Sequence, residues 1–259
     1  MTAAAPLATS ALAIDEARER RVAWRLVLLV LAVLTLVKPL GGIPVVGTVG
    51  FTIAAALQLY LPLWRAEKLD VPYGFFGLHL EAWRRDLRIL LVLCAIAFPP
   101  YVLAHHLYMT AFHDWARELG LGALAGYFPR RVLAPAWPTG VVAWLAGAWW
   151  LVQIVATHTL GVALPEEAFY RGYLQPRLES AWPPARRILG VPFGRAAVVA
   201  AALFAAGHFL GEWNPLRWGP FFPALVFAWQ RNATRSVAGA VTFHAACNVF
   251  GELLASLYR

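Results

Sequence analysis

Long apolar stretches dominate this sequence and limit the folds open to it. The chain has 259 residues, of which 60% are hydrophobic and 14% are charged, whereas soluble domains carry about 45–50% apolar and about 25% charged residues. Seven stretches are long enough, or nearly so, to cross a hydrocarbon core about 30 Å thick. They cover residues 23–41, 44–64, 88–110, 140–164, 194–211, 217–230 and 236–256. The predicted fold is an all-α polytopic membrane helix bundle with about seven transmembrane helices.

The domain organisation follows from these stretches. Residues 1–22 are rich in alanine and then in charged side chains, which predicts a flexible cytoplasmic tail with a short helix. No basic segment leads directly into an apolar run and a cleavage site, so no signal peptide is expected. Residues 23–259 are predicted to form a single membrane-embedded domain, with the catalytic core at about 150–256.

Positive charge is spread over several connections between the apolar stretches. The net charge of +8 therefore indicates contact with anionic lipid headgroups and control of topology, and not a nucleic-acid groove. The positive-inside rule places the N-terminus in the cytoplasm and the C-terminus outside after seven crossings. Arg130 and Arg131 are the exceptions to this orientation. The only two cysteines, Cys94 and Cys247, argue against a disulfide framework or a cysteine-rich zinc site.

Several polar residues lie inside the apolar stretches, where each ionisable group costs about 2.5–3.5 kcal/mol. They are Glu166, Glu167, Arg171, His208, His244 and Asn248. The first three follow Pro165, where the helical pattern of the fourth stretch continues to about residue 178. At a rise of about 1.5 Å per residue, the first glutamate and the two histidines fall at similar depths in the bilayer. We therefore expect them to meet in one layer of the bundle.

The spacing of these residues is helical. Glu167 and Arg171 are four residues apart, so they share a helix face and can pair. Glu166 points about 100° away from that face and is free to act as a general base. An alternative role for the Glu167 and Arg171 pair is purely structural.

Two further motifs repeat the spacing of four. Phe204 and His208 place an imidazole over an aromatic ring, and His244 and Asn248 share a face. A histidine and an asparagine amide can supply two hydrogen-bond donors to an oxyanion. They can also act only as hydrogen-bonding contacts between helices. The whole set favours a hydrolase with its active site in the membrane.

In this order the three motifs resemble the CPBP family of CAAX-processing and bacteriocin-processing intramembrane proteases. The same family is also called Abi or type II CAAX prenyl endopeptidase. The resemblance covers about residues 150–256 and extends to Pro165 before the glutamates and Gly172 after the arginine. The resemblance implies a glutamic-type protease. A myxosortase-like bacterial enzyme is one kind of family member that this chain could be.

The resemblance also implies a role for each residue. Glu166 and His208 would activate the attacking water, while His244 and Asn248 would stabilise the oxyanion. Glu167, Arg171 and Phe204 would be supporting residues.

The metal-free mechanism is favoured for such a site. Zinc held by Glu166, His208 and His244 stays open as the alternative, because three protein ligands and a water form a catalytic zinc pattern. The sequence has no His-Glu-x-x-His motif, however.

The implied activity is an intramembrane endopeptidase that cuts near the C-terminus of a membrane-associated or lipidated protein. Its partners would be a membrane protein or peptide with a C-terminal processing signal and the lipid bilayer, but no nucleic acid. The Ala-, Arg- and Trp-rich composition favours a bacterial inner membrane. A proton- or ion-coupled transporter would require inverted repeats, and none is evident. A catalytically silent scaffold would have degraded motifs, and all six positions are intact.

Overall fold

The computed structural model describes residues 14–259, so most of the predicted cytoplasmic tail lies outside the described residues. One helical segment falls on each of the seven predicted stretches, which confirms the all-α bundle. The segments are α1 (Glu16–Val37), α2 (Pro44–Leu69), α3 (Trp83–Thr110), the continuous stretch Val141–Glu179, α9 (Arg195–Phe209), α10 (Phe221–Thr234) and α11 (Ala238–Ala255).

Four of these segments are long and apolar enough to cross a membrane unaided. They are Glu16–Leu40, Pro44–Leu69, Trp83–Thr110 and Val141–Glu179. The C-terminal helices α9, α10 and α11 are shorter, with 15, 14 and 18 residues. A helix of 14 residues extends only about 21 Å, which is less than the hydrocarbon thickness. The protein is integral to the membrane, and its shortest helices are held within the bundle by their neighbours.

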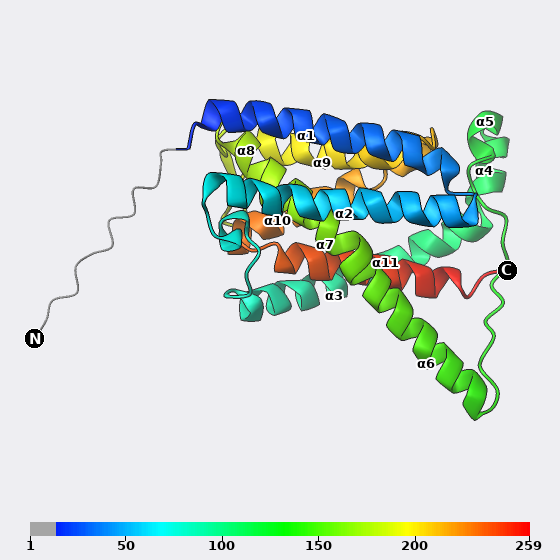
Figure 1. Ribbon diagram of the computed structural model, residues 1–259. Helices are drawn as coiled ribbons and strands as arrows, with labels where there is room; N and C mark the ends of the chain where they lie inside the picture. Colours follow the sequence, from blue (N-terminus) through cyan, green and yellow to red (C-terminus); the bar gives the residue numbers. More distant parts are fainter. Residues whose placement is uncertain (1–13) are drawn as a thin grey trace, which may run out of the picture.

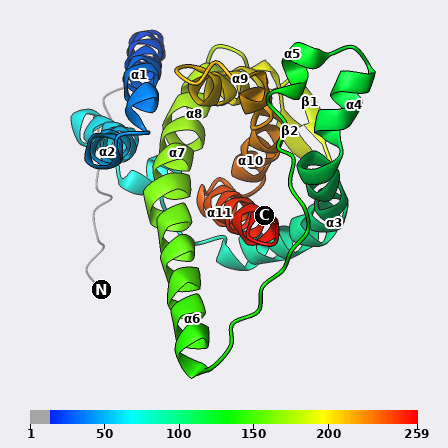
Figure 2. The same ribbon diagram turned by 90° about the vertical axis from the view of Figure 1, so that its right-hand side faces the viewer.

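The helices lie around the long segment Val141–Glu179, as the end view shows (Figure 2). Helices α1 and α2 pack together on one side of it, and α3, α10 and α11 lie on the other. The start of α1 and the C-terminus are at opposite ends of the bundle (Figure 1). The arrangement brings helices that are distant in sequence against the central segment.

The central segment is continuous but not uniform. It consists of α6 (Val141–Ala156), the π-helix η3 (Thr157–Ala163), α7 (Leu164–Glu167), the π-helix η4 (Ala168–Leu174) and α8 (Gln175–Glu179). Proline has no N–H to donate, so Pro165 interrupts the regular hydrogen-bond ladder without ending the helix. The helix continues past Pro165 as predicted. Single π-helical turns inside α-helices occur frequently at functional sites.

The two ends of the central segment have different surroundings. Helix α6 leaves the bundle at an angle (Figure 1), and Ile154 is its single buried residue. Every residue of η4 is buried against the surrounding helices. Gly172 permits this packing, because a Cβ atom at that position would lie 2.7 Å from the carbonyl oxygen of Phe76. The segment that carries Arg171 and Gly172 is therefore closely packed against its neighbours.

The start of the first span differs from the prediction. Residues 16–22 were assigned to the tail, but they form the first turns of α1. Asp15 caps the helix by accepting a hydrogen bond of 2.9 Å from the backbone N–H of Arg18. Glu16 pairs with Arg177 at 2.8 Å, and the buried Glu19 pairs with Arg65. The charged residues at this end therefore serve as helix-to-helix contacts.

A small β-hairpin follows the central segment and was not predicted. Strand β1 (Arg186–Ile188) pairs with the antiparallel strand β2 (Val191–Phe193). The two residues between them, Leu189 and Gly190, both have positive φ, which is typical of a type I′ turn. The indole N–H of Trp229 donates to the carbonyl of Ile188 at 2.8 Å and fixes the hairpin to α10.

The remaining elements are short. Helix α4 (Phe112–Glu118) follows α3, and α5 (Gly122–Ala125) follows α4. The 3₁₀ turns are η1 (Lys38–Leu40), η2 (Tyr73–Phe76) and η5 (Pro215–Trp218). Of these, η1 and η5 contribute residues to the site.

Candidate active site

A buried ionic network connects the central segment to α11. Arg171 Nη1 donates to Glu167 Oε1 at 3.1 Å, and both side chains are 0% exposed. The predicted pairing of these two residues is confirmed. His244 Nδ1 lies 2.9 Å from the same carboxylate oxygen, so in the ionised state of Glu167 the imidazole is the donor. The pair thus also orients His244, which the sequence did not predict.

Aromatic rings surround this network. The Arg171 guanidinium lies 4.5 Å from the centre of the Phe204 ring and 5.3 Å from that of Phe227. Phe227 also stacks on His244, with ring centres 4.9 Å apart and planes inclined by 15°. A second guanidinium nitrogen, Nη2, donates to the carbonyl of Ala224 at 3.2 Å. These contacts hold the Arg171 guanidinium and the His244 imidazole between α9, α10 and α11, and they leave His244 little freedom to rotate.

Glu166 points away from Glu167, as predicted from the helical spacing. Its Oε2 atom lies 3.8 Å from His244 Nε2, and 18% of its side chain is exposed. This distance is too long for a hydrogen bond. The same Oε2 atom is buried and has no hydrogen-bond partner among the described residues. A buried carboxylate oxygen in this state is available to a water molecule or a substrate.

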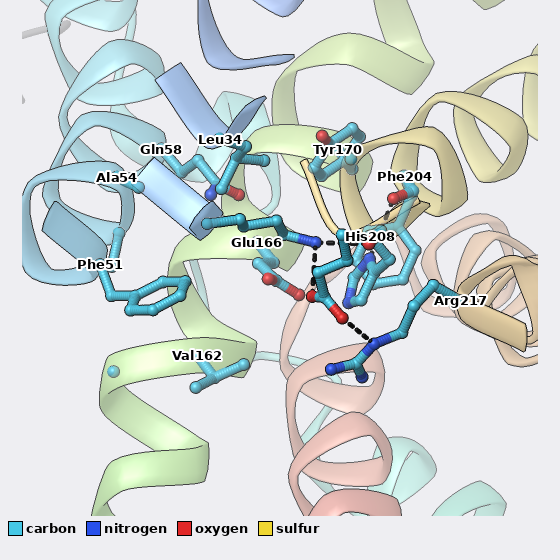
Figure 3. A pocket seen from close by; sticks show the side chains of 15 residues that line it. Leu34, Phe51, Ala54, Gln58, Val162, Glu166, Tyr170, Phe204, His208 and Arg217 are labelled. Carbon is cyan, nitrogen blue, oxygen red and sulfur yellow. Dashed lines mark hydrogen bonds and ion pairs between the residues drawn. The ribbon is translucent and has the colours of Figure 1, made fainter. Parts of the chain in front are cut away.

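His208 comes to the site from the last turn of α9. Its Nδ1 atom lies 3.0 Å from the carbonyl of Phe204, and only the protonated nitrogen can donate to that oxygen. The lone pair of the neutral imidazole is therefore on Nε2. The predicted contact with Phe204 is present, since the ring centres are 4.5 Å apart. His208 makes no direct hydrogen bond with Glu166 among the described residues; both side chains face one cavity (Figure 3).

Two adjoining cavities contain the predicted catalytic residues. A polar cavity of about 340 Å³ is lined by Glu166 and His208. An apolar cavity of about 600 Å³ is lined by His208, His244 and Asn248. Phe204 and His208 line both, and these volumes are typical of small-ligand sites. The structure therefore places a carboxylate, two imidazoles and a carboxamide around the junction of two cavities.

Three charged residues of the polar cavity were missed by sequence reasoning. Lys38, from η1, pairs with Glu212 at 3.2 Å and donates to the backbone carbonyl of His208. Arg217, from η5, also pairs with Glu212. Burial acts to raise the pKa of Glu212, but hydrogen bonds from Arg217 and Lys38 hold that pKa below its ordinary value. No local sequence pattern marks this cluster, because its members stand at helix ends and in a loop.

Other histidines have partners away from the two cavities. His158 Nε2 lies 2.6 Å from Glu252 Oε2, connecting η3 to α11. His106 contacts the hydroxyl of Tyr258 at 2.9 Å. Within residues 14–259, no three His, Cys, Asp or Glu side chains are grouped closely enough to be a candidate metal site.

Comparison with known proteins identifies the family of the segment that carries this site. Residues 147–250 match the family described as type II CAAX prenyl endopeptidase, Rce1-like. This segment is therefore similar to the Rce1-like family, and it is called the Rce1-like segment below. It begins in α6 and ends in α11, and it contains all seven predicted site residues. No curated protein and no solved structure gives a significant match to the chain. The resemblance seen in the three motifs is thus confirmed for the Rce1-like segment.

Proposed function

We propose that this protein is an intramembrane endopeptidase that hydrolyses a peptide bond near the C-terminus of a membrane-associated or lipidated protein. One observation carries the proposal: Glu166 and His208 face one cavity, while His244 and Asn248 face the adjoining one. This arrangement supports the proposal, because a carboxylate and an imidazole can activate water and an imidazole and a carboxamide can stabilise an oxyanion. Similarity to the CAAX endopeptidase family supports the same reaction class.

In the first step, Glu166 acts as the general base. Its free Oε2 atom accepts a proton from a water molecule while the water oxygen attacks the carbonyl carbon of the substrate. The Nε2 lone pair of His208 accepts a hydrogen bond from the same water and orients it. The side chain of Phe204 lies beside this imidazole and separates it from the buried arginine.

The tetrahedral oxyanion that forms is then stabilised by hydrogen-bond donors. The Asn248 amide supplies one, and His244 Nε2 supplies a second when the imidazole is cationic, because its Nδ1–H is already bonded to Glu167.

Collapse of the intermediate completes the reaction. Glu166 returns the proton to the amide nitrogen as the C–N bond breaks. The products are one fragment with a new carboxylate and one with a new amine. Every proton transfer in this sequence uses groups of the chain and one water molecule.

Asn248→Ala should lower kcat by about 10²–10³-fold, as expected for the loss of one oxyanion donor. The KM should change little, because the hydrogen bond forms in the transition state. Steady-state peptide cleavage by purified protein in detergent or nanodiscs measures both constants. Cys247→Ala is the matched control, since Cys247 precedes Asn248 and lines the same cavity. An Asn248→Ala rate within a few-fold of the wild type would remove Asn248 from the mechanism.

The proposed activity can be tested in cells before the substrate is known. C-terminal peptides of membrane proteins would be mapped by mass spectrometry with the wild-type protein and with Glu166→Ala. We expect a set of shortened C-termini that appears only with the wild type. Identical C-termini in the two strains would contradict proteolysis.

We propose that catalysis needs no metal. Activity should persist after prolonged treatment with a strong chelator, because water activation rests on Glu166 and His208. Cleavage rates before and after chelation, with and without added zinc, measure this. Complete loss of activity that zinc restores would contradict the metal-free mechanism and favour Glu166, His208 and His244 as ligands.

The substrate class is proposed from the cavity and the composition together. Phe98, Tyr101 and Phe222 line the apolar cavity beside the catalytic groups, which suits an apolar or lipidated segment next to the cleaved bond. The partner would be a membrane protein or peptide with a C-terminal processing signal, handled by a myxosortase-like enzyme in a bacterial inner membrane. The composition of this chain, which is rich in Ala, Arg and Trp, supports the assignment to a bacterium.

A further inference from the structure

The polar cavity carries a charged cluster that the hydrolytic steps do not use. We infer that Lys38 and Arg217 bind the free α-carboxylate of the substrate's last residue, and so direct cleavage close to a C-terminus. This inference rests on the proposed function, because it assigns substrate selection to the same cavity. The cluster comes from η1 and η5, outside the Rce1-like motifs, and it lies beside Glu166 and His208 (Figure 3).

Lys38 is built into the wall of this cavity. Only 9% of its side chain is exposed, and its ammonium group pairs with Glu212 and donates to the backbone carbonyl of His208. An ammonium group has three donors, so one N–H stays without a partner among the described residues. The contact with the His208 backbone also fixes the distance between this cation and the catalytic imidazole.

Arg217 supplies a second cation nearer to solvent. Its Nε donates to Glu212, and 51% of its side chain is exposed. Within the described part of the chain neither Nη group forms a hydrogen bond, so both can donate to a ligand. A guanidinium presents its donors as a planar fork that matches the two oxygens of a carboxylate. This side chain is thus suited to bind a chain terminus arriving from solvent.

The charge and size of the cavity fit the same ligand. Within the cluster, Lys38 and Arg217 outweigh Glu212 by one positive charge, although the Glu166 carboxylate balances that charge over the cavity as a whole. The cluster itself therefore favours an anion. The Glu166 carboxylate would repel that anion, so the substrate carboxylate is driven toward Arg217 and away from the reacting water. A volume of about 340 Å³ is at the lower end for ligand sites. The cavity therefore accommodates a C-terminal fragment of a few residues and not a long chain.

The inference predicts that the enzyme distinguishes a C-terminal acid from an amide. The probe is a library of N-terminally acylated peptides with four randomised final residues, made both as free acids and as amides. Wild-type protein in phosphatidylcholine nanodiscs should cleave the acids at least about tenfold faster in kcat/KM, consistent with one charged hydrogen-bonded contact. In Arg217→Gln the ratio of acid to amide cleavage should fall toward one. Arg217→Lys should restore part of the preference.

Arg130→Gln is the matched control, because Arg130 is an exposed arginine paired with Asp114 in another part of the molecule. It should keep the wild-type ratio. Equal cleavage of acids and amides by the wild type would overturn this inference and leave the proposed function intact. Cleavage of neither form, even by the wild type, would count against both. A third outcome is a ratio of acid to amide cleavage near one, together with binding to phosphatidylglycerol nanodiscs that depends on Arg217. This outcome would show that the cluster binds lipid phosphate, and it would overturn the assignment to the substrate carboxylate.

Discussion

Glu166→Gln should reduce peptide cleavage by about 10²–10⁴-fold, the range that a positioned general base contributes. Glutamine keeps the shape of the side chain but cannot take a proton from water. Glu166 is 18% exposed and forms no hydrogen bond through its Oε2 atom, so the variant should fold normally. The rate is measured as fragment release by purified protein, and folding is checked by a thermal melt in detergent.

Glu252→Gln provides the control for this variant. Glu252 is also a carboxylate within the bundle and also faces a histidine, His158, but it lines neither of the two cavities. Its substitution should leave the cleavage rate close to that of the wild type. If both variants were equally slow, the effect would come from a general disturbance of the bundle. If Glu166→Gln were as fast as the wild type, Glu166 would not be the base.

Arg171→Met should destabilise the protein by about 3–5 kcal/mol, because it leaves the Glu167 carboxylate buried without its cationic partner. Both side chains are 0% exposed. The substitution also removes the donor to the Ala224 carbonyl and the guanidinium between Phe204 and Phe227. The free energy of unfolding, measured by denaturant titration in mixed micelles, should fall by this amount together with the yield of folded protein.

A double variant separates charge burial from lost packing. Glu167→Gln combined with Arg171→Met removes both charges, while the glutamine oxygen can still accept from His244 Nδ1. It should recover most of the lost stability, since replacing a buried ion pair as a whole costs little. A double variant that is less stable than Arg171→Met alone would show that the pair is not held by charge compensation.

Helix positions and the motif residues were predictable, because both depend on local sequence. The apolar stretches located all seven helical segments, and spacing of four placed Arg171 beside Glu167 and His208 beside Phe204. The similar depth estimated for Glu166, His208 and His244 agrees with their positions around adjoining cavities. In these cases helix geometry alone is enough to predict where the residues lie.

Contacts between helices were not predictable in the same way. The hydrogen bond from His244 to Glu167 joins residues 77 positions apart, and nothing in the local pattern selects that partner. Phe227 was missed because an aromatic residue in an apolar stretch has no distinguishing feature, although it stacks on His244. Lys38 and Arg217 looked like ordinary charges at helix ends, and only the three-dimensional arrangement puts them at the cavity with Glu166.

The most direct test of the central claim is a double-mutant cycle between Glu166 and His208. If both side chains act on one water molecule, removing either should disable the same step, and residues that act as a unit are strongly non-additive. The kcat/KM of Glu166→Gln combined with His208→Asn should then be close to that of the slower single variant. A double variant slowed by the product of the two single effects would show that they act independently, and it would contradict a shared water.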